Sequence, residues 1–372
     1  MNILALNVGS SSLKFRLFQI APDAETVLTE GVVERLDAHD VLPAAQKAIE
    51  QCRPLGIDAV GHRVVHGGAR FSQPTRVTPD VLQGLHALGA LDPLHNPAEV
   101  ALIEATQRLL PAAPNVAVFD TAFHRTLPER AWRYALPSDL ADKLGLRRYG
   151  FHGISHAYVS QRLLQCLGRE AEGTRLVTCH LGSGASVCAV QDGQSVDTSM
   201  GMTPLEGLVM GTRSGDIDPG LLLYLMQTQH RTAEDLDDLL NHKSGLLGLS
   251  GRSADVRELE QAAQHGDKKA GLALDIFAYH VSKYIGAYAA VLNGVDAVAF
   301  AGGIGERSAA VRHRICQTLA FLGLTMDDTR NREAGHQEPT RISADNAAVQ
   351  AWVVPTDEER QIARETCAVL RT

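Results

Sequence analysis

The 372-residue chain has no basic tract and no apolar run of membrane-spanning length. Its 35 lysines and arginines are outnumbered by 43 aspartates and glutamates, which gives a formal net charge of −8. A nucleic-acid partner is not expected, because no clustered positive charge is present to neutralise a phosphate backbone. With 45% apolar and 21% charged residues, the composition predicts an ordered globular protein without membrane attachment.

Targeting signals and paired cysteines are also missing. The first six residues carry neither a basic leader nor an apolar stretch of signal-peptide length. The six cysteines are scattered without any Cys-x-x-Cys pair, so we expect reduced thiols buried as small hydrophobes. Both absences favour a cytoplasmic protein.

The length predicts two domains, because one hydrophobic core rarely serves 372 residues. No low-complexity linker separates them, so the boundaries are inferred. We place the first domain at residues 1–122 together with about 358–372, and the second at 123–357. A cleft between two such domains is a common place for a ligand.

Two segments of the chain share one pattern. In the first, apolar residues 3–6 and 13–20 flank a turn that contains Gly9 and three serines. In the second, residues 176–181 and 187–190 flank a turn that contains Gly182. Aligning the two glycines also aligns the flanking strands, which predicts two copies of one α/β unit. Two such turns facing each other can hold a polyphosphate from both sides.

Two further apolar runs are typical of buried strands. Residues 115–119 run into Asp120, and residues 297–301 run into a glycine-rich turn at 302–306. Ligands of open α/β sheets gather at the carboxyl ends of such strands, and a strand, turn and helix can accept a nucleotide. The turn matches neither GxxxxGK[ST] nor a correctly placed GxGxxG. A role for Asp120 as a helix cap is an equally good local interpretation.

Helical patterns surround these strands. Asn96, Pro97 and Glu99 form a helix start that we interpret as structural. The periodicity predicts helix from residue 255 to about 292. At the C-terminus, Glu359 lies three residues after Thr356, in the capping-box position, so we assign it to the helix end. Under that assignment Glu358 is not needed at the helix end and can bind a ligand.

Arginine and histidine carry the strongest chemical signal. Arg213 lies among glycines and carboxylates in Gly-Thr-Arg-Ser-Gly-Asp, where its guanidinium suits phosphoryl oxygens; a surface-loop arginine is the competing interpretation. Arg63 interrupts a predicted strand, and a half-buried arginine needs an anionic partner such as a carboxylate substrate. His152 and His156 have the spacing of a zinc helix, but Gly153 weakens it, and we favour His152 as a donor to a transferring group.

Together these segments resemble the acetate kinase family, part of the superfamily of acetate and sugar kinases, heat-shock chaperone ATPases and actin. The matching segments span nearly the whole chain. The block at residues 196–207, which leads into the Arg213 motif, is similar to that family and not to its distant relatives. The resemblance implies two duplicated ribonuclease H-like domains of the α/β class, with mixed sheets flanked by helices and the active site in the cleft between them.

The resemblance also implies an activity and its ligands. The activity is reversible, direct in-line transfer of the ATP γ-phosphoryl group to acetate, giving acetyl phosphate and ADP, with Mg²⁺ as the metal, for which Mn²⁺ can substitute. A homodimer is implied as well. Catalysis would fall to Asp120, His152 and Arg213, and metal binding to Asn7 and Glu358. The acetate site would comprise Arg63, Val65, Leu94, Phe151 and Pro204. The phosphates and the nucleotide would contact Ser10, Ser12, Lys14, His180, Leu181, Gly182, Ser183, Gly184, Asp255, Val256, Arg257, Gly303, Ile304, Gly305, Glu306 and Arg307.

Three features depart from the family pattern. Ser183 and Arg307 stand where asparagine is usual, which bears on nucleotide affinity or base preference. The chain is also shorter than usual between the first hairpin and Arg63, without loss of any motif residue.

Two alternatives stay open beside acetate kinase. A kinase for propionate or another short-chain acid would use the same mechanism, and the pocket around Val65 and Pro204 decides between them, since one methylene is worth roughly 1–3 kcal/mol. A nucleotide-binding sensor or ATPase of the same superfamily would have no carboxylate substrate. Arg63, Asp120 and Arg213 argue against that second alternative.

Overall fold

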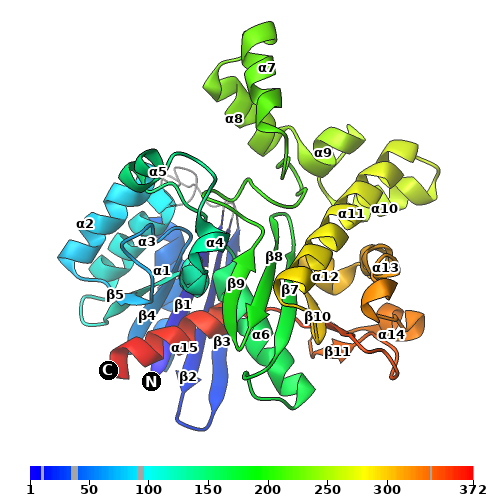
Figure 1. The fold of residues 1–372 in the computed structure, drawn as a ribbon. Coiled ribbons are helices and arrows are strands. Elements are labelled where there is room, and N and C mark those ends of the chain that lie inside the picture. Colours follow the sequence, from blue (N-terminus) through cyan, green and yellow to red (C-terminus); the bar gives the residue numbers. More distant parts are fainter. Residues whose placement is uncertain (10–11, 35–40, 91–95, 336, 372) are drawn as a thin grey trace. The chain divides into compact units, whose positions relative to one another are not determined.

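The computed structural model describes residues 1–9, 12–34, 41–90, 96–335 and 337–371 (Figure 1). The chain forms two compact units. The first contains Met1–Arg125, Phe151–Tyr158 and Asp357–Thr372, and the second contains Thr126–Gly150 and Val159–Thr356. The segment with His152 therefore belongs to the first unit, although the sequence-based boundary placed it in the second. That boundary stays a prediction about independently folding domains.

The first unit is built on a six-stranded mixed sheet in the order β3-β2-β1-β4-β6-β5. The hairpin predicted at the N-terminus is β1 with β2, which pair in antiparallel register. β4 then pairs in parallel with both β1 and β6. The strand bounds are β1 (Asn2–Val8), β2 (Ser12–Ile20), β3 (Glu25–Glu34), β4 (Ala59–Val64), β5 (Thr75–Arg76) and β6 (Asn115–Phe119).

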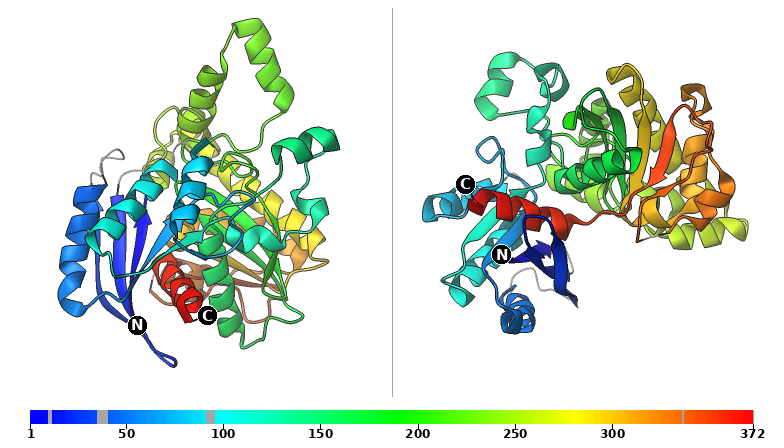
Figure 2. Two further views of the ribbon diagram at one scale, coloured as in Figure 1. Left: turned by 90° about the vertical axis from the view of Figure 1, so that its left-hand side faces the viewer. Right: turned by 90° about the horizontal axis from the view of Figure 1, so that it is seen from below.

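Helices cover both faces of this sheet because its central strands alternate apolar side chains on two sides. Leu4 and Leu6 pack with α1 and α3, whereas Ile3 and Ala5 pack with α15. Figure 2 shows α1 and α15 on opposite faces of the sheet. The helices of this unit are α1 (Leu42–Cys52), α2 (Pro79–Ala87), α3 (Asn96–Leu109) and α15 (Glu358–Arg371), with short turns η1 (Arg53–Leu55), η2 (Leu88–Ala90) and η3 (Ala122–Thr126).

The second unit repeats the same sheet topology, in the order β11-β12-β10-β7-β8-β9. β7 and β8 form the second hairpin, and β10 pairs in parallel with both β7 and β12. The predicted duplication and α/β class are thereby confirmed. The bounds are β7 (Arg175–Leu181), β8 (Ala185–Gln191), β9 (Gln194–Thr198), β10 (Ala297–Ala301), β11 (Thr340–Arg341) and β12 (Gln350–Val353).

The helices of the second unit include one pair that projects from its body, α7 (Pro219–Gln229) and α8 (Ala233–His242) (Figure 1). The helical stretch predicted from residue 255 is divided into α10 (Val256–Gln264) and α11 (Lys268–Val291), because Gly266 adopts a positive φ and Asp267 caps α11. The others are α4 (Glu129–Trp132), α5 (Ser138–Leu144), α9 (Gly245–Ser250), α12 (Gly302–Arg307), α13 (Ala309–Gln317), η4 (Ala320–Leu322) and α14 (Asp328–Glu333), while α6 (Gly153–Leu167) begins in the first unit.

Candidate functional site

A buried arginine–aspartate pair lies at the carboxyl ends of two neighbouring strands of the first unit. Arg63 lies on β4, and Asp120 directly follows β6. Nη2 and Nε of Arg63 donate to Oδ2 of Asp120, at 2.7 and 3.2 Å. Burial disfavours the guanidinium charge, but Asp120 and Glu358 outweigh it and raise the pKa of Arg63. Oδ1 of Asp120 is buried and has no hydrogen-bond partner among the described residues. A buried carboxylate oxygen without a partner is costly, which marks it as a place for a ligand.

Acidic side chains surround Asn7 at the end of β1. Its amide nitrogen donates to Oε2 of Glu358 at 2.9 Å and to Oε1 of Glu359 at 3.0 Å. Its amide oxygen accepts from Nη1 of Arg63 at 3.4 Å. Burial raises the pKa of Glu358, with Asp120 adding to the effect and Arg63 opposing it. Burial and Glu358 together raise the pKa of Glu359.

This donor set suits a hard divalent cation. Crowded carboxylates with raised pKa values gain stability when a cation neutralises them, and carboxylate and amide oxygens are its preferred ligands. Within the described ranges, no group of three or more histidine, cysteine or acidic side chains could hold a metal by itself. A cation here would share its coordination with other oxygen ligands, as Mg²⁺ does when it binds phosphates.

His152 occupies a strained position beside Asp120. Its φ is +56°, in the left-handed region that non-glycine residues rarely adopt, and such strain concentrates at functional sites. The next residue, Gly153, donates its N–H to the Asp120 carbonyl at 2.9 Å, and a Cβ at Gly153 would overlap that oxygen. α6 begins only at Gly153, so His152 and His156 do not share a helix face as a zinc helix requires.

The residues predicted to surround the substrate methyl group are distributed over both units. Val65 and Phe151 are buried in the first unit, and Pro204 is half-buried in the second. Leu94 lies outside the described residues. The Val65 N–H donates to Oε2 of Glu99 at 2.9 Å, so the helix start that we interpreted as structural holds this segment.

The predicted phosphate contacts of the first hairpin are partly described. Lys14 is exposed on β2 and lies opposite Asn7 in the strand register. Ser12 begins β2 and is half-buried. Ser10 lies outside the described residues.

Arg213 lies in the long segment between β9 and α7 of the second unit. It is half-buried, and its Nη1 donates to the Pro204 carbonyl at 3.4 Å. The Arg213 carbonyl accepts from the Met210 N–H at 3.1 Å, which joins the backbone on both sides of Gly211 and Thr212. Arg213 thus lies in a loop, as both interpretations of it require, and is partly buried there.

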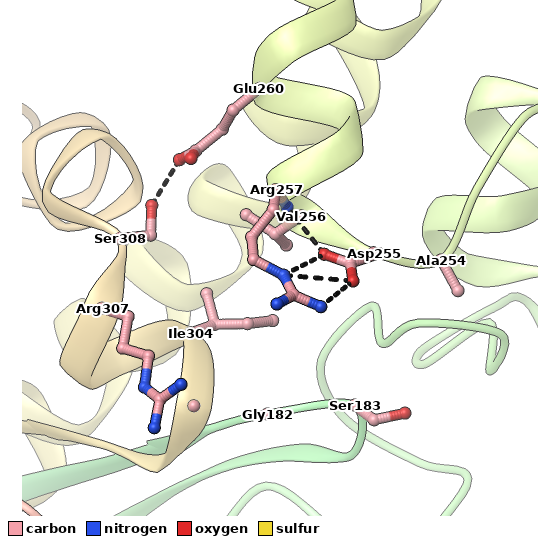
Figure 3. A pocket seen from close by; sticks show the side chains of 11 residues that line it. Gly182, Ser183, Ala254, Asp255, Val256, Arg257, Glu260, Ile304, Arg307 and Ser308 are labelled. Atoms are coloured by element: carbon pink, nitrogen blue, oxygen red, sulfur yellow. Dashed lines mark hydrogen bonds and ion pairs between the residues drawn. The ribbon is translucent and has the colours of Figure 1, made fainter.

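A pocket of about 440 Å³ opens at the strand ends of the second unit (Figure 3). Its walls come from the second hairpin, from the start of α10 and from α12. Of the predicted nucleotide contacts, eight line it: Gly182, Ser183, Asp255, Val256, Arg257, Gly303, Ile304 and Arg307.

Charges inside this pocket are unevenly paired. Asp255 caps α10 and accepts from the Arg257 side chain, with Nη2 to Oδ2 at 2.5 Å, and this bond lowers the pKa of Asp255. Arg307 extends from α12, and its side chain makes no hydrogen bond or ion pair with another described residue (Figure 3). One cationic side chain is thus available to an anionic ligand.

The other predicted nucleotide residues do not line this pocket. Glu306 accepts from the Gly302 and Thr356 N–H groups, at 2.9 and 3.0 Å, so it braces the turn instead. His180, Leu181, Gly184 and Gly305 also lie away from the pocket lining.

Sequence reasoning missed several residues at both sites. Glu359 contacts Asn7, although its capping-box position assigned it to the helix end. Its place directly after Glu358 was the available signal. Ala254, Glu260 and Ser308 line the pocket, and Ala254 and Ser308 each lie next to a predicted residue.

The duplicated sheets with charged strand ends define a class, the two-unit α/β phosphotransferases, and solved structures agree. An acetate kinase structure from Porphyromonas gingivalis matches with a TM-score of 0.91 at 42% identity, covering 99% of both chains. A propionate kinase structure from Francisella tularensis matches with a TM-score of 0.89 at 40% identity, again over 99% of both chains.

Sequence comparisons define the family. The model of the Acetokinase family matches residues 44–364. Curated relatives named acetate kinase, from Acetivibrio thermocellus and Geobacillus kaustophilus, are 46% and 47% identical over 100% and 98% of this chain and equal shares of their own. The chain belongs to the acetokinase family. Membership implies a kinase that uses ATP or ADP with a divalent metal.

The same comparison bears on chain length. The alignment with the Acetivibrio thermocellus relative extends over 401 positions, more than the 372 residues of this chain.

No helix among the described residues is long and apolar enough to cross a bilayer.

Proposed function

We propose that this chain is an acetate kinase, which transfers the γ-phosphoryl group of ATP reversibly to acetate. The observation that carries the proposal is the Arg63–Asp120 pair, which presents a cation and an unpartnered carboxylate oxygen at adjacent strand ends. Family membership supplies the reaction class, and curated relatives with that name cover the whole chain.

The chemistry needs little from the protein beyond positioning and charge. Acetate is already a nucleophile, so no proton has to be removed before it attacks the γ-phosphorus. The enzyme must bring two anions together and stabilise charge on the transferring group. We assign binding of the acetate carboxylate to Arg63 and the role of catalytic carboxylate, of the acid/base type, to Asp120. Stabilisation of the transition state is assigned to His152 and Arg213. The strained His152 backbone supports its assignment, because strain of that kind concentrates at functional sites.

Val65, Phe151, Leu94 and Pro204 are proposed to enclose the methyl group of acetate. Val65 and Phe151 are 3% and 1% exposed, so an apolar surface is already present in the first unit. Aliphatic walls of this kind reject a longer acid only modestly, by roughly 1–3 kcal/mol per methylene. Propionate is the second candidate substrate, and a 40% identical structure named propionate kinase favours testing it.

Mg²⁺, or Mn²⁺ in its place, is the proposed metal, held by Asn7 and Glu358. The fit rests on the crowded carboxylates at Asn7 and on the unpartnered Asp120 oxygen. When bound, the cation supplies charge neutralisation for the nucleotide phosphates. Ser10, Ser12 and Lys14 are proposed to face those phosphates.

ATP or ADP is proposed to bind the pocket of the second unit. Its volume of about 440 Å³ lies in the range of small-molecule sites. Val256 and Ile304 offer apolar faces for the base, and Arg307 supports binding of an anionic part. His180, Leu181, Gly184, Gly305 and Glu306 are kept as proposed contacts of the phosphate-binding turns.

We further propose a homodimer formed through α7. Its Leu223 and Tyr224 are 59% and 57% exposed, and no residue of α7 is buried. Large apolar side chains gathered on a projecting helix favour an interface. Light scattering after size exclusion tests this, because Leu223→Glu should convert a dimer to a monomer. A cytoplasmic location agrees with the unpaired cysteines.

The test of the activity is acyl-phosphate formation, trapped with hydroxylamine, from Mg-ATP and acetate, propionate or butyrate. Acetate should give the highest kcat/KM and butyrate the lowest. Arg213→Ala should lose most of the rate with every acid. If none of the acids yields acyl phosphate while ATP still binds, the kinase proposal is wrong.

A further inference from the structure

The segment between β9 and α7, residues 199–218, has no helix or strand, yet it carries Pro204 and Arg213. Loops of this length inside a compact unit are uncommon and are usually functional. Met200, Leu208 and Met210 are fully buried, so the segment is packed and not a surface excursion. Something must fix its path, because it lacks the ladder bonds of a regular element.

Glu206 is held by two side chains from the segment before Gly150. Its Oε2 accepts from the Tyr134 hydroxyl at 2.5 Å, and its Oε1 accepts from Nη2 of Arg148. The same Tyr134 oxygen accepts from the Met202 N–H at 2.9 Å. One phenol therefore joins residues 202 and 206, and closes a turn with Pro204 between them.

Arg148 ties this turn to the end of β9. Its Nη1 donates to the carbonyls of Thr198, Ser199 and Met200 at 3.1, 3.1 and 2.9 Å. The side chain is 16% exposed, so these bonds are made largely away from solvent. Gly201 permits the arrangement, because a Cβ there would overlap the Glu206 carboxylate and the Tyr134 hydroxyl.

The closed turn connects directly to Arg213, whose Nη1 donates to the Pro204 carbonyl. On the far side, Asp216 accepts from the Gly207 N–H at 2.8 Å and from the Tyr284 hydroxyl at 2.6 Å. The loop is thus anchored before and after Arg213. Burial, with Glu206 adding to the effect, raises the pKa of Tyr134, so its hydroxyl stays a donor at neutral pH.

We propose that Glu206, held by Tyr134 and Arg148, is a positioning residue that fixes the 199–218 loop and through it the direction of the Arg213 guanidinium. Its link to catalysis rests on the proposed function, which gives Arg213 the transition-state role. Glu206 itself contacts no substrate in this account.

The first test needs no activity. Hydrogen exchange of Glu206→Gln should show faster exchange across residues 199–216, with the β7 and β8 amides unchanged. Tyr134→Phe should show the same pattern more weakly, since it removes the hydroxyl and keeps the ring. Asp296→Asn is the matched control, because it breaks the Arg175–Asp296 pair elsewhere in the same unit. Unchanged exchange in the loop of both variants overturns the proposal whether or not the chain is a kinase.

The second test is a double-mutant cycle with Arg213→Ala. Glu206→Gln should lower kcat by about tenfold to a hundredfold in the wild-type background, as small misplacements of catalytic groups do. In the Arg213→Ala background it should cost less than about twofold, because the group it positions is gone. Tyr134→Phe should follow the same non-additive pattern, and the Kd for ADP should not move.

Each outcome of the cycle has one meaning. Additive losses in both backgrounds, or a loss that only parallels the fraction of folded protein, would show that Glu206 acts on stability alone and would overturn the proposal. A wild-type chain that makes no acyl phosphate would end the proposed function, and the exchange result would still decide whether Glu206 fixes the loop.

Discussion

The central strands β4 and β10 occupy equivalent places in the two sheets but carry different chemistry. Leu6 lies opposite His62 in the first sheet, and Cys179 lies opposite Phe300 in the second. Aligning the hairpins at Gly9 and Gly182 makes those two pairs correspond. His62 and Phe300 are then equivalent, and so are the residues that follow them, Arg63 and Ala301. One topology therefore presents a guanidinium at one site and a methyl group at its counterpart.

The two units differ in function at their strand ends and not in their sheets. In the first unit, charged groups fill the strand ends, and Arg63, Asp120 and Glu358 act on one another. In the second, small residues follow the strand, and Gly303 with Ile304 borders an open pocket. The sheet fixes the positions, and the residues at strand ends assign the roles. We interpret this as a partial division of labour: Arg63, Asp120 and the proposed metal-binding residues belong to the first unit, and the proposed nucleotide pocket belongs to the second, which also carries Arg213 and Pro204.

The largest expected effect comes from removing the charge at the strand end of the first unit. Asp120→Asn should lower kcat by about a hundredfold to a thousandfold, the usual cost of losing one preorganised electrostatic group. It also leaves Arg63 without its closest counter-charge. Initial rates of acyl-phosphate formation measure this. A loss below about fivefold, well short of such a cost, would contradict the assigned role.

The complementary change fills the pocket of the second unit. Ala254→Trp should weaken ADP binding by about tenfold to a hundredfold, because overpacking typically costs 1–3 kcal/mol. The KM for acetate should stay near its wild-type value. Calorimetric titration with ADP gives the affinity, and Ala254→Ser, which adds one oxygen, is the control expected to bind ADP normally. If Ala254→Trp binds ADP with the same affinity as the wild type, the nucleotide does not bind in this pocket.

A smaller effect should separate geometry from charge at Arg63. Arg63→Lys keeps the positive charge and loses the planar donor pair that meets Asp120. We expect the KM for acetate to rise about tenfold, since a charge-assisted hydrogen bond contributes about 1.5–3 kcal/mol. The affinity for ADP should not change. If ADP binding weakens as much as acetate binding does, the division of labour is wrong.

The smallest expected effect is on the pH dependence of folding stability. It arises from His62, whose equivalent in the second sheet, Phe300, does not titrate. Burial lowers the pKa of His62 to about 4. The hydrogen bond between its Nε2 and Asn115 acts in the opposite direction, because it favours the charged form. Its Nδ1 is buried without a partner among the described residues, so protonation would put an unsatisfied donor in the core.

The sign of this pH effect follows from the lowered pKa. The unfolded chain binds a proton on His62 near pH 6.5, and the folded chain resists it until about pH 4. His62 therefore contributes full stability above pH 6.5 and loses about 1 kcal/mol of it by pH 5.5. Urea unfolding from pH 7.5 to 5.5 should show a flatter acid limb for His62→Gln. The exposed His242→Gln is the control, and a slope unchanged in His62→Gln would contradict the assignment.

The fold was largely predictable because its signals are local. Residues 3–6 and 13–20 have strand patterns around a turn, and the repeat at Gly182 exposed the duplication. The break between α10 and α11 was missed, although Gly266 and Asp267 are a stop and a start signal, because the apolar residues on either side keep one helical spacing. Helix periodicity alone does not detect a short interruption whose flanks keep the same register.

The site was predictable in its residues and less so in its contacts. Arg63 and Asp120 are far apart in the chain, and only the register of β4 against β6 brings their strand ends together. Neither the positive φ of His152 nor the unpartnered Asp120 oxygen leaves a mark in the sequence. Glu359 was misjudged because a local cap explained it first. Glu206 gave no local signal, since α6 and the strands β7, β8 and β9 separate it in the chain from its partners Tyr134 and Arg148.

The most direct test of the division of labour is an ADP titration of Asp120→Asn by calorimetry. We expect this variant, almost inactive in phosphoryl transfer, to bind ADP with an affinity within about twofold of the wild type, because every residue that lines the proposed nucleotide pocket belongs to the second unit and Asp120 belongs to the first. An affinity reduced tenfold or more would contradict it, and would show that the charged strand ends of the first unit are part of the nucleotide site.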